Sequence, residues 1–127
     1  MSYLVDMDDI KAGDELLGPA ATERELKEAH EALIEMAAEE GVAEADIKAT
    51  TVVKRYIRYY TYMITAVKKA FSLPGAAFKD GSKADSYSSK ISFYQKEIEK
   101  LEGKLTKYTL TGEGDAQYMK TIPVFRG

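Results

Sequence analysis

His30, the only histidine of the chain, is the first residue to weigh as a catalytic or metal-binding group. A zinc or di-iron site needs further ligands, but the chain has no second His and no Cys, and Lys27 stands where the Glu-x-x-His pattern of di-iron bundles requires Glu. The G-x-S-x-G turn of serine hydrolases is also absent. We therefore interpret His30 as a residue at the edge of the core, and we expect no catalytic residue, metal or cofactor.

Two further groups of residues invite a chemical interpretation that their spacing does not favour. Gly75 and the run 81–83 (GSK) are spaced wrongly for a phosphate-binding loop, and no predicted strand precedes them. Glu28, Glu31 and Glu35 lie within a helical turn of one another, as paired acid/base or metal-binding carboxylates do. They fall opposite the apolar positions of their helix, which favours a solvated acidic face.

Basic residues and tyrosines interleave in the segment 54–62 (KRYIRYYTY), the composition that phosphate contacts and base stacking require. At 100° per residue, however, Tyr56, Tyr59 and Tyr60 fall on the apolar side of a helix, which leaves mainly Tyr62 among the cations. The spacing favours core packing with a basic face behind it. Direct DNA binding by that face is the alternative function.

The first helical pattern runs over residues 23–40. Thr22 is placed as its N-cap, with Glu25 three residues later in a capping-box arrangement, and Gly41 is placed to end it. The acidic positions described above lie on its outer side. A short helical turn over residues 8–12, capped by Asp6, is predicted within the N-terminal segment 1–21.

The second helical pattern, residues 51–71, is the most apolar part of the chain, and we expect it to form the core. Its apolar side chains cover about half of the helix circumference. The other half carries Lys54, Arg58 and Lys68, and we place Thr61, Tyr62 and Thr65 there as well. Pro74 and Gly75 end this helix, and residues 72–84 are predicted to form a loop.

The third pattern predicts a long heptad-patterned helix over about residues 85–110, followed by an extended C-terminal arm over residues 111–127. Gly103 lies off the seam and predicts a weak point. The spacing favours an antiparallel hairpin or a helix that contacts another subunit. The fold class is therefore mainly α, a small helical bundle. The apolar seam positions are Tyr87, Ile91, Tyr94, Ile98, Leu101, Leu105 and Tyr108.

The length of 127 residues predicts one domain, residues 1–127, large enough to bury a core without disulfide or metal staples. The absence of Cys fits a reducing compartment, and we expect neither a signal peptide nor a membrane span. The formal net charge of -3 hides a partition. Residues 1–47 hold 14 acidic and 3 basic side chains, a net charge of −11, whereas residues 48–110 hold 5 acidic and 13 basic, a net charge of +8.

Several runs along residues 50–127 resemble head-tail connector (adaptor) proteins of tailed bacteriophages and prophages. These runs are 52–56 (VVKRY), 85–98 (DSYSSKISFYQKEI), 105–106 (LT) and 123–127 (PVFRG), and the main shared pattern is D-x-Y-x-x-K-x-x-x-Y. The resemblance implies a non-catalytic structural subunit of a ring, commonly of twelve copies, between portal and tail around the DNA channel. It implies portal and tail-side proteins as partners, only non-specific contact with DNA, and a place in the virion after assembly in the bacterial cytoplasm.

A ring contact joins two different patches of identical subunits, and the acidic helix 23–40 of one copy against the basic face of the next would supply them. The apolar C-terminal arm also needs a surface to lie on. The acidic and basic surfaces could meet between subunits or within one subunit, and the sequence is compatible with both. The predicted interface residues are Glu28, Glu31, Glu35, Lys54, Arg58, Lys68, Tyr118, Ile122, Val124 and Phe125.

Overall fold

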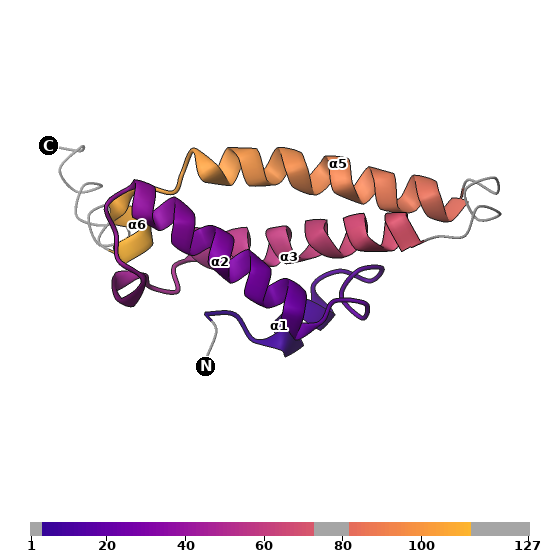
Figure 1. The fold of residues 1–127 in the computed structure, drawn as a ribbon, viewed down its shortest axis with the longest axis horizontal. Helices are drawn as coiled ribbons and strands as arrows, with labels where there is room; N and C mark the ends of the chain where they lie inside the picture. The colour runs from indigo at the N-terminus through magenta and orange to yellow at the C-terminus, as the bar shows by residue number, and fades with distance from the viewer. Residues whose placement is uncertain (1–3, 73–81, 113–127) are drawn as a thin grey trace, which may run out of the picture.

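The computed structural model describes residues 4–72 and 82–112, and in these ranges all regular structure is helical (Figure 1). The prediction of a mainly α, small helical bundle is confirmed. The elements in chain order are α1 (Met7–Ala12), α2 (Glu23–Glu39), the short 3₁₀ helix η1 (Glu44–Asp46), α3 (Thr51–Ser72), α5 (Ser82–Glu102) and α6 (Lys107–Thr111).

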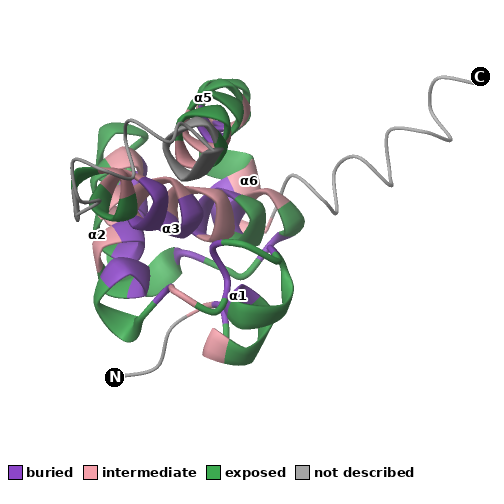
Figure 2. Ribbon diagram, turned by 90° about the vertical axis from the view of Figure 1, so that its right-hand side faces the viewer, coloured by how far each residue is buried: buried purple, intermediate pink, exposed green. Residues whose placement is uncertain are grey.

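Helix α3 is the centre of the bundle, as its apolar composition predicts. It forms an antiparallel hairpin with α5, and α2 crosses its other side. In the view turned by 90°, α3 lies in the middle, surrounded by α5, α2, α6 and the segment around α1 (Figure 2). Val53, Tyr56 and Ile57 of α3 are at most 1% exposed. Burial of such side chains contributes about 1.5–3 kcal/mol each, so these three residues together stabilise the fold by several kcal/mol.

Helix α2 begins and ends close to the predicted positions. The carboxylate of Glu25 accepts a hydrogen bond from the Thr22 backbone N–H at 3.0 Å, as expected for a capping box. Beyond the last helical residue, Glu39, the chain turns at Gly41 with a φ of 78°, a conformation that glycine adopts without strain. The short helix predicted over residues 8–12 is also present, as α1.

The prediction of one helix over residues 85–110 is wrong, because α5 ends at Glu102 and a separate short helix, α6, follows. Gly103 has low helix propensity, and the Thr106 hydroxyl accepts from the Thr109 backbone N–H to start a new helix. The change of direction leaves Tyr108, a predicted seam position, 48% exposed, while Leu110 is fully buried. The seam positions from Tyr87 to Leu105 are all buried or half-buried, as the heptad spacing predicts.

The side of α3 that carries Thr61, Tyr62 and Thr65 is not solvent-facing as predicted, because all three side chains are buried. The N-terminal segment packs against Tyr62, whose hydroxyl donates to the Ile10 carbonyl oxygen at 2.6 Å. The two threonine hydroxyls donate to carbonyl oxygens one helical turn earlier in α3. The basic face of α3 is therefore narrower than the sequence pattern predicts.

Candidate interaction surface

The described residues hold no cluster of three or more His, Asp or Glu side chains that could bind a metal ion. His30 is 6% exposed on the inner side of α2, next to fully buried Ala29, which confirms its place at the edge of the core. In the same ranges, no helix is long and apolar enough to cross a membrane.

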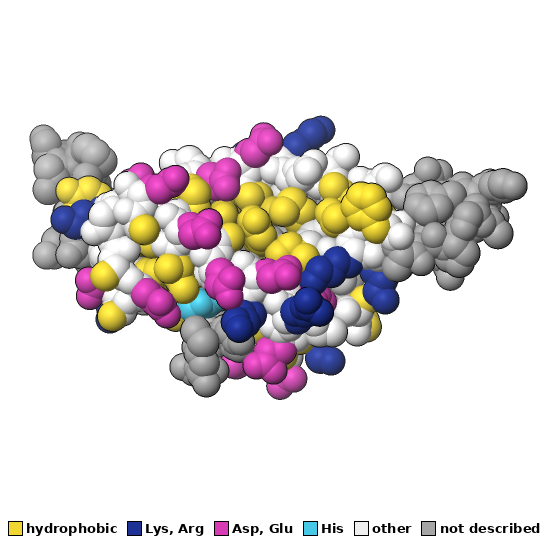
Figure 3. Space-filling view, in the orientation of Figure 1, with side chains coloured by type: hydrophobic (Ala, Val, Ile, Leu, Met, Phe, Trp, Pro, Cys, Tyr) yellow, Lys and Arg dark blue, Asp and Glu magenta, His cyan; other side chains and the backbone are white. Residues whose placement is uncertain are grey.

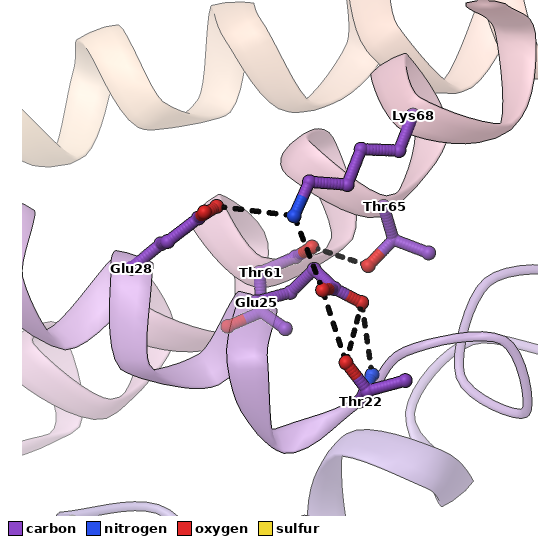
Figure 4. A network of polar contacts seen from close by, with 6 residues as sticks. All are labelled: Thr22, Glu25, Glu28, Thr61, Thr65 and Lys68. Carbon is purple, nitrogen blue, oxygen red and sulfur yellow. Dashed lines mark hydrogen bonds and ion pairs between the residues drawn. The ribbon is translucent and has the colours of Figure 1, made fainter.

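Two predicted interface residues, Glu28 and Lys68, contact each other within one chain. The Lys68 Nζ lies 3.5 Å from a carboxylate oxygen of Glu28 and 3.2 Å from one of Glu25 (Figure 4). The Lys68 side chain is 44% exposed, so the pairs contribute at most about 1 kcal/mol. At this point the acidic face of α2 and the basic face of α3 meet inside the subunit.

Glu25 is the buried member of this network, at 6% exposure, and sequence reasoning used it only as a capping residue. Its carboxylate also accepts from the Thr22 hydroxyl at 3.0 Å. Burial alone would raise the pKa of Glu25, but the hydrogen bonds from Thr22 and the charge of Lys68 outweigh it and lower the pKa below its ordinary value. The carboxylate stays charged and ties the start of α2 to α3.

The other charged residues of the predicted interface are Glu31, Glu35, Lys54 and Arg58. Glu31, Glu35 and Lys54 are exposed, and none of them forms an ion pair with another side chain in the described ranges. Arg58 is half-buried, with its Nε shielded from solvent. The predicted interface residues of the C-terminal arm, Tyr118, Ile122, Val124 and Phe125, lie outside the described residues.

Tyr62 does not stand among exposed cations, as the DNA-binding alternative requires. It is 1% exposed, and burial raises its pKa to about 12. Its ring packs against Tyr94 with centroids 5.4 Å apart. A base could not stack on this tyrosine without unpacking α3 from α5.

A row of apolar side chains on α3 is only partly covered by the other described elements. Tyr60, Ile64, Val67 and Phe71 recur at three- and four-residue spacing and so share one face of the helix; we call them the apolar strip. The first three are half-buried and Phe71 is 85% exposed. Figure 3 shows hydrophobic side chains gathered in a band between α2 and α5, with acidic side chains along the α2 side.

The position of the strip between α2 and α5 follows from its neighbour Tyr56. The rings of Tyr56 and Tyr60 lie 5.7 Å apart, at the start of the strip. Burial raises the pKa of Tyr56, and the nearby carboxylates of Glu102 on α5 and Glu35 on α2 raise it further. Glu102 of α5 and Glu35 of α2 are therefore near Tyr56, one helical turn before the strip.

A second feature, missed by the sequence reasoning, is the buried carboxylate of Asp14. Its side chain is 1% exposed and accepts hydrogen bonds from four groups. The donors are the backbone N–H of Leu16 (2.9 Å), the backbone N–H of Leu17 (2.8 Å), the Lys90 Nζ (3.0 Å) and the Tyr94 hydroxyl (2.5 Å). An Asp before turn residues forms such backbone bonds often, so the run 14–19 (DELLGP) carried a weak signal.

The electrostatics of this carboxylate follow from its donors. Burial would raise the pKa of Asp14, but the hydrogen bonds from Tyr94, Leu17 and Lys90 outweigh it and lower the pKa. Burial and the Asp14 carboxylate raise the pKa of Tyr94, so its hydroxyl stays protonated and donates. Asp14 thus fixes the N-terminal segment to α5. Beside it lies an open hollow of about 550 Å³, lined by Leu16, Ser86, Ser89, Lys90 and Phe93.

Acid should destabilise the chain through Asp14 and Glu25. Both carboxyls have a folded-state pKa below the ordinary value, so their contribution is present above the unfolded pKa and is lost as the pH falls through the folded pKa. We expect the urea concentration at the midpoint of unfolding to decrease as the pH is lowered below about 5. The decrease should be less steep for Asp14→Asn. The same pH dependence in both proteins would contradict the assignment to Asp14.

No model of a known protein family matches this chain, and no curated protein or solved structure is significantly similar to it.

Proposed function

We propose that the chain is a non-catalytic structural subunit that assembles head-to-tail into a ring, as the head-tail connector proteins of tailed bacteriophages and prophages do. The observation that carries the proposal is the apolar strip, which the other described elements leave partly exposed between α2 and α5. Contiguous apolar surface rimmed by charge is typical of protein interaction sites. A second copy would remove the strip from water.

The charged groups support a contact between different patches. Since Lys68 pairs with Glu28 within the subunit, the charges left for a neighbour are Glu31 and Glu35 on α2 and Lys54 on α3. Patches of opposite sign orient the approach of one subunit to the next and lower the affinity for wrong registers. This is the arrangement that a heterologous, ring-closing interface uses.

In the proposed role, the ring lies in the virion between the portal and the tail after assembly in the bacterial cytoplasm. Portal and tail-side proteins are its partners, and twelve is the copy number that the resemblance implies. DNA passes through the channel and makes only non-specific contacts with it. This role needs no catalytic residue, cofactor or membrane.

The purified chain should form a discrete oligomer of many times 14.1 kDa, visible as closed rings by electron microscopy. Sedimentation velocity over a series of salt concentrations should show dissociation as salt screens the charged patches. Lys54→Glu should weaken assembly more than Lys96→Glu, the same charge reversal at an exposed position on α5. A monomer at every protein concentration would contradict the ring, and an oligomer unchanged by salt would contradict charge-driven assembly.

A further inference from the structure

We infer that the apolar strip of one copy binds residues 118–125 of a neighbouring copy. The inference rests on the proposed ring and names the surface that receives the arm. The strip supplies a linear apolar track on α3 that ends at Phe71, the most exposed large hydrophobic side chain among the described residues. A linear track of this kind fits a single extended segment better than it fits a flat protein surface.

The composition of the arm complements the strip. Residues 118–126 (YMKTIPVFR) hold five large apolar side chains and two cations, with no carboxylate. Pro123 biases the residue before it toward an extended backbone, in which Ile122 and Val124 share a face with Lys120. The apolar face would lie on the strip. Lys120 and Arg126 lie at the two ends of the apolar face, so one of them would approach Glu35 and Glu102 near the start of the strip.

The length of the chain after α6 lets the arm reach the strip of its own chain or that of a neighbouring copy. Gly112 lies against Lys48 and Thr50, at the N-terminal end of α3, whereas Phe71 is at the opposite end. The 20 residues from Thr51 to Phe71 span about 30 Å of helix, and the 13 residues from Gly112 to Phe125 reach about 45 Å when fully extended. The chain's own arm is therefore long enough to reach the whole strip. The choice of a neighbouring copy rests on the proposed ring, and cross-linking decides it.

The exposed aromatic residues offer a matched pair of variants for testing the strip. Phe71→Ser should raise the concentration at which half of the chains are assembled about tenfold, the effect of losing one well-packed contact residue. Phe93→Ser removes a 51% exposed ring from the other side of α5, beside Leu16, and should leave that concentration unchanged. Both variants should unfold at the same urea concentration as the parent chain. Equal effects of the two variants on assembly would overturn the role of the strip.

The absence of cysteine allows a direct test of the occupant in the full chain. Two single-cysteine chains, Ile64→Cys and Val124→Cys, are mixed, assembled and treated with a short bismaleimide. We expect a covalent heterodimer. The pair Ser92→Cys with Val124→Cys, in which Ser92 is exposed on α5 away from the strip, should give little product.

The same reagent applied to a double variant, Ile64→Cys with Val124→Cys, separates the possible outcomes. Covalent multimers support exchange of arms between copies, whereas a product linked only within one chain overturns it. Sedimentation of the untreated variants decides the proposed function separately. An oligomer that gives no Ile64–Val124 link refutes the arm contact and leaves the ring standing, and a monomer refutes both.

Discussion

Asp14→Asn should destabilise the folded chain by about 3 kcal/mol, one of the two largest effects that we expect from a single substitution. The amide keeps one oxygen for the backbone N–H groups of Leu16 and Leu17 but presents an NH₂ group to two donors, Lys90 Nζ and the Tyr94 hydroxyl. Lys90 then loses its only carboxylate partner in the described residues. A buried hydroxyl and a partly buried ammonium are left without an acceptor.

The measurement is urea unfolding at pH 7, with Glu15→Gln as the control. Glu15 is the next residue, is exposed, and loses the same unit of charge on substitution, so it reports the effect of charge alone. Glu15→Gln should change the free energy of unfolding by less than about 0.5 kcal/mol. Similar losses in both variants would show that the Asp14 hydrogen bonds do not stabilise the fold.

Interactions close in sequence were predictable in this chain. The start of α2 follows from Thr22 and Glu25, which lie three residues apart and bond to each other. The packing of α5 on α3 follows from the heptad spacing up to Leu105. Beyond Gly103 the heptad pattern wrongly predicted that the helix continues. The low helix propensity of glycine and the Thr106 cap outweigh the one further apolar seam position, Tyr108.

Interactions between distant segments were not predictable from periodicity. Tyr62 is buried and donates a hydrogen bond to Ile10, which lies 52 residues earlier in the chain. Asp14 accepts a hydrogen bond from Tyr94, which lies 80 residues later. A helical wheel describes one helix and contains no information on a loop that packs over its polar side. The contact of Lys68 with Glu28 is of the same kind, which is why the sequence left open whether opposite charges meet within a subunit or between subunits.

Gly18→Ala should cost about 2–3 kcal/mol of folding stability, the upper part of the usual range for forcing extra volume into a packed site. Gly18 is buried in the turn after Asp14, and its N–H donates to the Asp14 carbonyl oxygen at 2.8 Å. A Cβ atom at this position would overlap the Lys11 carbonyl oxygen and lie 2.5 Å from that of Asp14. Both neighbours are backbone atoms, which cannot rotate away, so the turn that presents Asp14 to α5 would have to shift.

The matched control is Gly103→Ala, the same substitution where the nearest atom to the new Cβ, the Lys100 carbonyl oxygen, is 3.5 Å away. Gly103 is exposed and its φ is not positive, so alanine fits there and should stabilise the chain by about 0.5 kcal/mol by restricting the unfolded state. Urea unfolding of the two variants should therefore move in opposite directions from the parent. If Gly18→Ala unfolds at the same urea concentration as Gly103→Ala, the turn after α1 is not closely packed, and Asp14 is held by its side-chain partners alone. If only Gly18→Ala is weakened, the backbone of residues 14–18 is part of what holds the N-terminal segment against α3 and α5.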